Sequence, residues 1–256
     1  MKNLLKITVA ACVLYSCSAT SQIVSRGEAI NKAGKQRMLT MKMAKNYMAI
    51  GANVRVAEAK LELEEAATVF NENYNDLTVF IKFKEASDAL DNVGTLWATF
   101  RNDVNDTPNA EMAPSIIRQA YALVSACSVV VDKYVANTGV KVAVLPNVCG
   151  KQRMYSQRLG MLYIAKYWQI AFPSINKDLA ETTVNYENGL TSLLKYTENT
   201  DEINTILKLQ KGEWNFTKKF FEPEVDQMAP TMVYSSTNLM TRNFDTATAL
   251  YAKLVN

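Results

Sequence analysis

Apolar residues recur every three or four positions through almost the whole chain, which is the spacing that places them on one face of an α-helix. No segment shows the apolar–polar alternation of a half-buried strand. Turn residues separate the helical stretches at 106–109, 137–139 and 172–174. The pattern predicts helices over 29–51, 54–81, 87–104, 110–135, 140–171, 174–196, 201–221 and 224–255, with Ser87 and Ser174 as caps. The segment 140–171 is one helix, or two if Pro146 breaks it.

An internal repeat divides these helices into two sets of four. The pentapeptide GKQRM occurs at Gly34–Met38 and again at Gly150–Met154, an offset of 150 − 34 = 116 residues. Further matches follow at nearly the same offset: Lys42 with Arg158, Met43 with Leu159, Tyr47 with Tyr163, and Trp97 with Trp214. We therefore predict an all-α protein with two tandem antiparallel four-helix-bundle modules, 22–138 and 139–256.

The first helix of each module has two apolar faces. On a helical wheel, Arg37 lies in the middle of one stripe, with Ile30, Met41, Ala44 and Met48. The second stripe consists of Leu39, Met43, Tyr47 and Ile50. One face fills the core of its own bundle, so the face of Arg37 is expected to meet a neighbouring module or subunit. Around Arg153 the corresponding face carries small residues, Gly150 and Gly160, which would admit a close helix or a small ligand.

An arginine within an apolar stripe cannot stay dry and unpaired. It must extend to water, pair with a carboxylate of a neighbouring helix, or meet an anion, for which its planar fork suits bidentate contact. All three alternatives are open from the sequence, because a repeated fold element could keep its arginine in both modules for packing alone. The candidate ligand-binding residues are Arg37, Arg153, Gly34, Gly150, Lys42 and Arg158.

Composition narrows the classes of function. The chain has 256 residues, of which 21% are charged, and a formal net charge of +3, which is too small and too mixed in sign for a nucleic-acid surface. It contains no histidine, no CxxC and no glycine-rich phosphate loop. We therefore expect no enzyme activity, no metal and no cofactor. Glu62, Glu64 and Glu65 are interpreted as a solvated helix face.

The N-terminus reads as a secretory signal over residues 1–21, with Lys2 and Lys6 before a short apolar core. Cleavage before Gln22 and lipoprotein processing before Cys17 are both open, since 14–17 (LYSC) is similar to a lipobox. Either route places the mature chain outside the cytoplasm, with the membrane contacted only through a lipid. Cys127 and Cys149 flank the turn at 137–139 at similar distances; they could form a disulfide or act as two small buried hydrophobes.

The segment Ala29–Gly51 resembles the opening helix of the PilJ-type domain, the N-terminal sensor domain of type IV pili methyl-accepting chemotaxis transducers, which is related to the periplasmic domain of nitrate/nitrite sensor kinases. The family pattern, roughly I-N-x-A-G-x-x-R-M-x-S-x-R, is matched here by Ile30, Asn31, Ala33, Gly34, Arg37 and Met38, and in the second module by Asn147, Gly150, Arg153, Met154, Ser156 and Arg158. Thr40 and Lys42 depart from it in the first module, and Cys149 in the second.

The resemblance implies an antiparallel helical bundle outside the inner membrane. In the nitrate/nitrite sensors the arginine that matches Arg37 and Arg153 contacts the anion at a subunit interface. The expected function is an extracytoplasmic, non-enzymatic, sensor-like module for a small oxyanion or small polar solute, working as a homo-oligomer or with a membrane sensor partner, because no kinase or methyl-accepting region follows in this sequence. The alternative is a structural or protein-interaction bundle without a small ligand.

Overall fold

The computed structural model describes residues 23, 25–222 and 227–255. The predicted signal segment 1–21 and Cys17 lie outside the described residues, so secretion and lipidation stay predictions. The described part of the chain holds eight α-helices, two short 3-10 helices and no strand, which confirms the all-α prediction. The α-helices are α1 Arg26–Gly51, α2 Val56–Phe80, α3 Lys84–Asn105, α4 Ala113–Thr138, α5 Val144–Tyr167, α6 Ile175–Leu193, α7 Asp201–Thr217 and α8 Pro230–Lys253; the 3-10 helices are η1 Lys141–Ala143 and η2 Lys218–Phe221.

Local chemistry explains several helix ends. The Ser25 hydroxyl accepts a hydrogen bond from the Glu28 backbone N–H, and Thr200 does the same for Ile203. Gly139 ends α4 in the left-handed region, at φ 66°. Pro146 does not break α5, because it lies in the first turn, where a helix has no intrahelical use for the missing N–H.

Two predicted caps differ from the structure. α3 begins at Lys84, three residues before Ser87, so the predicted start at Ser87 is wrong. Ser174 does precede α6, but its hydroxyl donates to the Asp178 carboxylate instead of accepting from the backbone. A side-chain partner four residues away has replaced the backbone N–H in this case.

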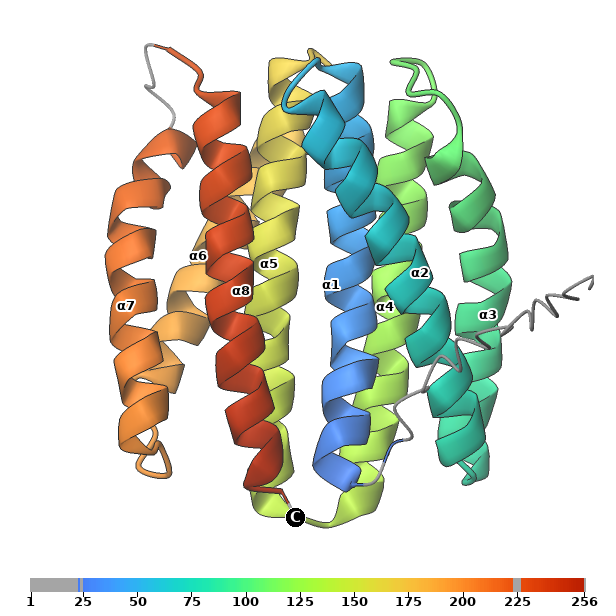
Figure 1. The fold of residues 1–256 in the computed structure, drawn as a ribbon, viewed down its shortest axis with the longest axis vertical. Coiled ribbons are helices and arrows are strands. Elements are labelled where there is room, and N and C mark those ends of the chain that lie inside the picture. The colour runs from blue at the N-terminus through green and yellow to red at the C-terminus, as the bar shows by residue number, and fades with distance from the viewer. Residues whose placement is uncertain (1–22, 24, 223–226, 256) are drawn as a thin grey trace, which may run out of the picture.

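The helices form two four-helix sets, α1–α4 and α5–α8, which lie side by side (Figure 1). α1 and α5 pack directly against each other at the centre and run in the same direction, and α8 also contacts α1. The repeat is visible in the cores as well. The Trp97 ring lies 4.2 Å from that of Phe70, and the Trp214 ring lies 4.4 Å from that of Tyr186. Two equivalent bundles thus share one central interface.

Both apolar faces of α1 are used within this chain. The hydroxyl of Tyr47, in the second stripe, accepts a hydrogen bond from the Asn109 backbone N–H in the first bundle. Met41, Ala44 and Met48, which share the stripe of Arg37, are completely buried. The guanidinium of Arg37 reaches the Asn147 carbonyl on α5. The face of Arg37 therefore meets the neighbouring module, as the two-stripe pattern predicts.

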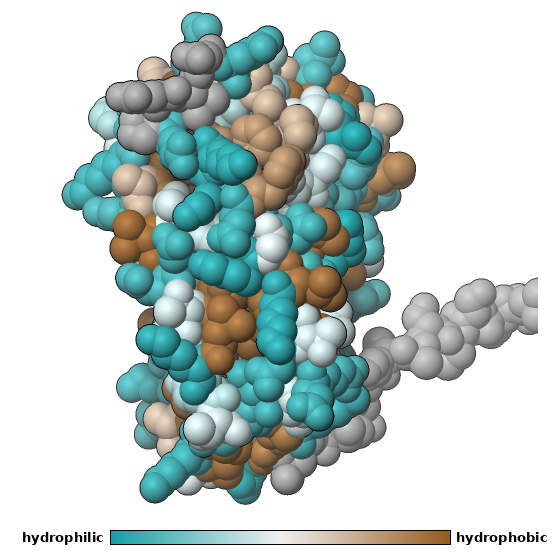
Figure 2. Space-filling view, turned by 90° about the vertical axis from the view of Figure 1, so that its left-hand side faces the viewer, coloured by the Kyte–Doolittle hydropathy of each residue, from teal (hydrophilic) through white to brown (hydrophobic). Residues whose placement is uncertain are grey.

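Hydrophobic surface is scattered over the outer helices. Figure 2 shows the side of the molecule where α6 and α7 lie, with separate apolar side chains on a mainly hydrophilic surface. Val184, Leu209 and Phe216 are among the exposed apolar residues of these helices. Of the described helices only α4 is long and apolar enough to cross a membrane by length and composition, and its core contacts with α1 and α3 account for that composition.

Candidate functional site

The two GKQRM segments meet across the interface between α1 and α5. A β-carbon built on Gly34 would lie 3.2 Å from Nη2 of Arg37 and 3.4 Å from Nη2 of Arg153. A β-carbon on Gly150 would lie 3.2 Å from Nη2 of Arg153 and 3.4 Å from Nη2 of Arg37. The glycines therefore provide the space in which both guanidiniums, here named the arginine pair, occupy one narrow gap. Both arginines have 0% exposure.

Arg153 is well supplied with acceptors. Its Nη1 lies 2.5 Å from a carboxylate oxygen of Asp245 on α8 and donates to the side-chain oxygen of Asn31 at 2.9 Å. Its Nη2 donates to the Asn31 carbonyl at 3.2 Å. Burial by itself would raise the pKa of Asp245, but the positive charges of Arg153 and Lys35 hold it below its ordinary value. Asp245 therefore remains an anion that neutralises Arg153.

Arg37 has far fewer partners. Its Nη2 lies 3.5 Å from the Asn147 carbonyl, while Nε and Nη1 are buried without an acceptor among the described residues. Burial, followed by repulsion from Arg153, lowers the pKa of Arg37 to about 10. Asp132 attracts it from a distance but instead accepts a hydrogen bond from the Asn147 side chain, at 3.1 Å. Arg37 is thus a buried cation without an ion-pair partner among the residues described.

The arginine pair holds two positive charges against one contacting carboxylate. Such an excess of buried charge is costly unless something else offsets it. The Nε and Nη1 donors of Arg37 and the Nε donor of Arg153 are free of partners among the described atoms. A small anion bound there would accept hydrogen bonds from these donors and would offset the repulsion between the two guanidiniums. Chemically, the arrangement is suited to anion binding.

Lys42 and Arg158 have other partners than the arginine pair. Lys42 lies 3.7 Å from Glu62 of α2 and lines a separate cavity. Arg158 lies 3.9 Å from Asp178 of α6, and its guanidinium lies over the Tyr121 ring. Of the six candidates from the sequence, the structure brings together Gly34, Gly150, Arg37 and Arg153. The repeat relation holds, but Lys42 and Arg158 occupy opposite flanks of the α1–α5 interface, towards α2 and α6.

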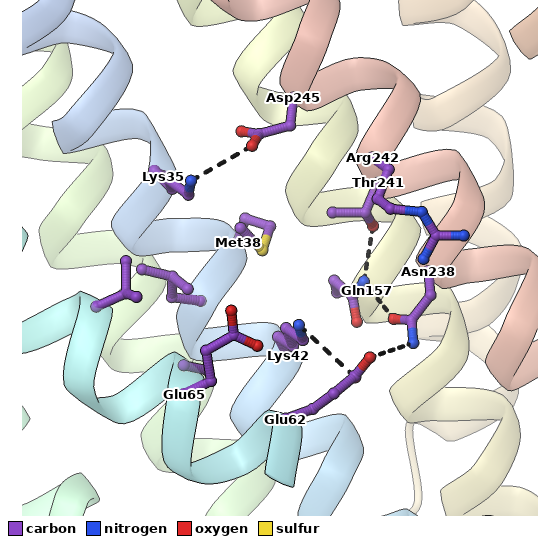
Figure 3. Close-up of a pocket in the computed structure, with 13 residues that line it drawn as sticks. Lys35, Met38, Lys42, Glu62, Glu65, Gln157, Asn238, Thr241, Arg242 and Asp245 are labelled. Carbon is purple, nitrogen blue, oxygen red and sulfur yellow. Dashed lines mark hydrogen bonds and ion pairs between the residues drawn. The ribbon is translucent and has the colours of Figure 1, made fainter. Parts of the chain in front are cut away.

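The interpretation of Glu62 as part of a solvated face is wrong. Its carboxylate accepts hydrogen bonds from Tyr234 at 2.9 Å and from the Asn238 side-chain nitrogen at 2.8 Å (Figure 3 shows the Asn238 contact). Lys42 and the buried Lys45 attract the same carboxylate and hold its pKa below the ordinary value, although burial alone would raise it. Glu64 and Glu65 are exposed, as expected. The helical pattern alone could not show that Glu62 is partly buried while Glu64 and Glu65 are exposed. The partners of Glu62 lie on α8, which is far away in the sequence.

Lys45 is a fully buried lysine that the sequence analysis missed. Its Nζ donates to the Asn238 side-chain oxygen at 2.5 Å and lies 4.1 Å from the centre of the Tyr234 ring. Burial lowers the pKa of Lys45 to about 7, in spite of the attraction of Glu62. Its position after an apolar run gives no sign of this polar network, which depends on residues of α8.

Lys45 should make stability depend on pH. The unfolded chain keeps this lysine protonated up to its ordinary pKa of 10.5, whereas the folded chain releases the proton near pH 7. Between those values the unfolded state binds more protons, so the free energy of unfolding rises with pH by up to about 1.4 kcal/mol per pH unit from this group. We predict that the free energy of unfolding of the wild type rises from pH 7 to pH 9 relative to that of Lys45→Met, which lacks the titrating group. Chemical denaturation of both proteins across this range measures the change. Parallel pH profiles of the two proteins would contradict the assignment.

Cys127 and Cys149 are free thiols. Cys127 and Cys149 are both buried and unpaired, and burial raises the pKa of each thiol to about 12. The Cys149 sulfur lies 3.8 Å from the Phe244 carbonyl. Of the two alternatives that the sequence left open, the structure has the small buried hydrophobes and not the disulfide. Similar height along two helices of a hairpin does not make two side chains face each other.

Other residues that contact the arginine pair could not be identified from the sequence. Asn31 and Asn147 match at the repeat offset, but only the structure shows that each supplies its carbonyl to the arginine of the opposite module. Asp245 lies on the last helix, with no motif around it. Among the described residues no group of three or more cysteines and carboxylates is placed to hold a metal ion.

Comparison with known proteins gives one match. Residues 19–120 match the model of the PilJ family, described as the type IV pili methyl-accepting chemotaxis transducer N-terminal domain. The matched range contains α1 and Arg37 and ends within α4. The match does not extend into the second bundle, whose relation to the first rests on the repeated residues and helix arrangement. No curated protein and no solved structure shows significant similarity to the chain.

Proposed function

We propose, from the premise that residues 19–120 form a PilJ-type domain, that this protein is a sensor-like module that acts outside the cytoplasm and binds one small oxyanion between Arg37 and Arg153. The second bundle would supply the half of the site that a second subunit would otherwise provide. A partner protein would carry the output, and a membrane sensor is the kind that the family description suggests. The proposed role involves no chemical conversion of the ligand.

The observation that carries the proposal is the unbalanced arginine pair. Arg37 is completely buried, faces a second guanidinium, and has two nitrogens without acceptors among the described atoms. A structural arginine would be expected to find a carboxylate, as Arg153 does with Asp245. An oxyanion would supply the missing negative charge, and its oxygens could accept from both planar forks. Nitrate, a planar anion with three oxygens, has the charge and the acceptor atoms that these donors require.

The space between the helices limits the ligand. Both arginine side chains have 0% exposure, so the gap around the guanidiniums is closed to solvent. A ligand must therefore be only a few atoms in size and must enter when the side chains or α1 and α5 move slightly apart. Its binding would replace repulsion between the arginines by attraction through the anion. Binding would thereby tighten the contact between the two bundles, which is a change that a partner could detect.

Thermal unfolding in the presence of different anions tests the proposal. We predict that nitrate or nitrite raises the melting temperature relative to chloride at equal ionic strength, because a ligand that binds only the folded state stabilises it. A concentration of about 100 times the dissociation constant would add ~2.7 kcal/mol. Arg37→Met should remove the difference between the anions. If the chloride and oxyanion curves coincide for the wild type, or if the shift persists in the variant, the anion site is wrong.

The alternative is a structural or interaction bundle without a small ligand, in which the Arg37 face of α1 serves only assembly. The packing of α5 and α8 of the same chain against that face agrees with this alternative as well. The unpaired donors of Arg37 would remain unexplained in a purely structural protein.

A further inference from the structure

A second polar cavity lies beside the α1–α5 interface, between α1, α2, α5 and α8 (Figure 3). Its volume is about 360 Å³, and it opens to solvent on one flank of the molecule. That size falls in the lower part of the range for small-molecule sites. Arg37 and Arg153 are not part of its lining, so it is distinct from the proposed anion site.

The hydrogen bonds around this cavity leave one acceptor without a donor. Glu62 is held as a carboxylate, so the Asn238 nitrogen must donate to it, and the Asn238 oxygen must face Lys45 and Gln157. The Gln157 nitrogen consequently donates to Asn238, at 3.1 Å, and to Thr241, at 2.7 Å. This chain of donors fixes the orientation of the Gln157 amide.

The Gln157 oxygen is the atom that remains. It is buried without a hydrogen-bond partner among the described residues, and the side chain is only 1% exposed. Figure 3 places the Gln157 side chain at the cavity, between Thr241 and Asn238 on one side and Lys42 and Glu62 on the other. A buried acceptor of this kind is costly unless a donor occupies the cavity. The first requirement for the occupant is thus an N–H or O–H group.

Charge on the cavity walls adds a second requirement. Lys35 lies 3.3 Å from Asp245, which also contacts Arg153, and Lys42 lies 3.7 Å from Glu62, so each of these two lysines has a carboxylate partner. Glu65 of α2 and Arg242 of α8 line opposite walls, and in the described part of the chain neither has an ion-pair partner. One wall therefore offers a free carboxylate and the other a free guanidinium. An occupant with both charges would satisfy both walls.

The rest of the lining is apolar. Met38 and Leu39 of α1 and Ala66 and Val69 of α2 cover one side of the cavity. This side has no donor or acceptor for a polar substituent and suits a short aliphatic group. The lining therefore favours an occupant with three groups: an ammonium group, a carboxylate and a small apolar side chain.

We infer that this cavity binds a small zwitterionic amino acid, with its ammonium group at the Gln157 oxygen and Glu65, and its carboxylate towards Arg242. The proposal rests on the lining of this cavity and does not depend on whether an oxyanion binds the arginine pair. Asp245 connects the two sites, since one of its oxygens contacts Arg153 and the other contacts Lys35 in the cavity wall.

Calorimetric titration of the full chain tests the site with three matched probes. L-alanine carries both charges, ethylamine carries only the ammonium and propionate only the carboxylate. We expect saturable binding of alanine and at least about tenfold weaker binding of the two single-charge compounds, because each lacks one charge-assisted contact. No heat from alanine would mean that the cavity holds only water. Equal affinities for alanine, ethylamine and propionate would mean that the cavity does not distinguish a zwitterion from a single charge. Either result overturns the inference.

Surface variants localise the binding without disturbing the fold. Glu65→Gln and Arg242→Gln should each weaken alanine binding about tenfold, because both side chains are exposed and each would contact one end of the ligand. Glu64→Gln is the control for the first, since Glu64 is the adjacent exposed glutamate and does not line the cavity. Equal affinities of Glu65→Gln and Glu64→Gln would contradict the assignment. Arg37→Met should leave alanine binding intact, which separates this site from the arginine pair.

Discussion

Replacing Arg153 by methionine should lower the free energy of unfolding by about 3 kcal/mol, whereas the same change at Arg37 should leave it unchanged or raise it by about 1 kcal/mol. The two residues occupy equivalent positions in the repeat and are equally buried. Their partners differ, however. Arg153 pairs with Asp245 and with two oxygens of Asn31, and these acceptors lose their donor in the variant.

Arg37 makes a single contact of 3.5 Å and repels Arg153, so its charge costs more than it returns in the absence of a ligand. Methionine keeps much of the side-chain length and removes the charge. Chemical denaturation of both variants in chloride, at one pH, measures the difference directly. Equal losses of stability would mean that Arg37 is a structural residue like Arg153, and the case for a ligand would fall.

Adding one methyl group at Gly27, where α1 meets α8, should also lower the free energy of unfolding by several kcal/mol. A β-carbon on Gly27 would lie 1.9 Å from the carbonyl oxygen of Ala252 and 2.8 Å from its carbonyl carbon. Both atoms belong to the backbone of α8, which cannot move aside as a flexible side chain would. We predict that Gly27→Ala lowers the free energy of unfolding by about 2–3 kcal/mol, because α1 must separate from α8 of the other bundle.

Gly212 provides the matched control. It lies inside α7, is exposed, and has nothing within 4 Å of the position of an added β-carbon. Gly212→Ala should therefore raise the free energy of unfolding by up to about 1 kcal/mol, since alanine favours the helix. Thermal and denaturant unfolding of the two variants give the comparison. A Gly27→Ala protein as stable as Gly212→Ala would show that the bundles are not held as closely as described.

The fold was largely predictable because its main signal is periodic and local. Three- and four-residue spacing and the turn residues gave eight helices, and the repeat of GKQRM gave two sets of four. The errors concern the predicted caps of two helices, Ser87 for α3 and Ser174 for α6. Ser87 had the right chemistry for a cap, but α3 begins at Lys84. Pro146 is harmless because of its place in the first turn of α5.

The candidate site was predictable only in part. The wheel of α1 located Arg37 on a face left for another module, and the repeat pointed to Arg153. The sequence could not show that Arg153 has a carboxylate partner and Arg37 has none among the described residues. That difference depends on Asp245 of α8, which is distant in sequence and lies in no recognisable motif. Glu62 was misjudged for the same reason, since Tyr234 and Asn238 of α8 are its partners. Contacts between distant helices carry the information that one helical pattern lacks.

Calorimetric titration of the purified chain with nitrate, in a chloride buffer, tests the central claim most directly. If Arg37 and Arg153 of one chain form a complete site, the titration should saturate at one nitrate per chain. The same titration of Arg37→Met should give no binding heat. Saturation at two nitrates per chain would assign a separate site to each arginine, and no binding by the wild type would contradict the account.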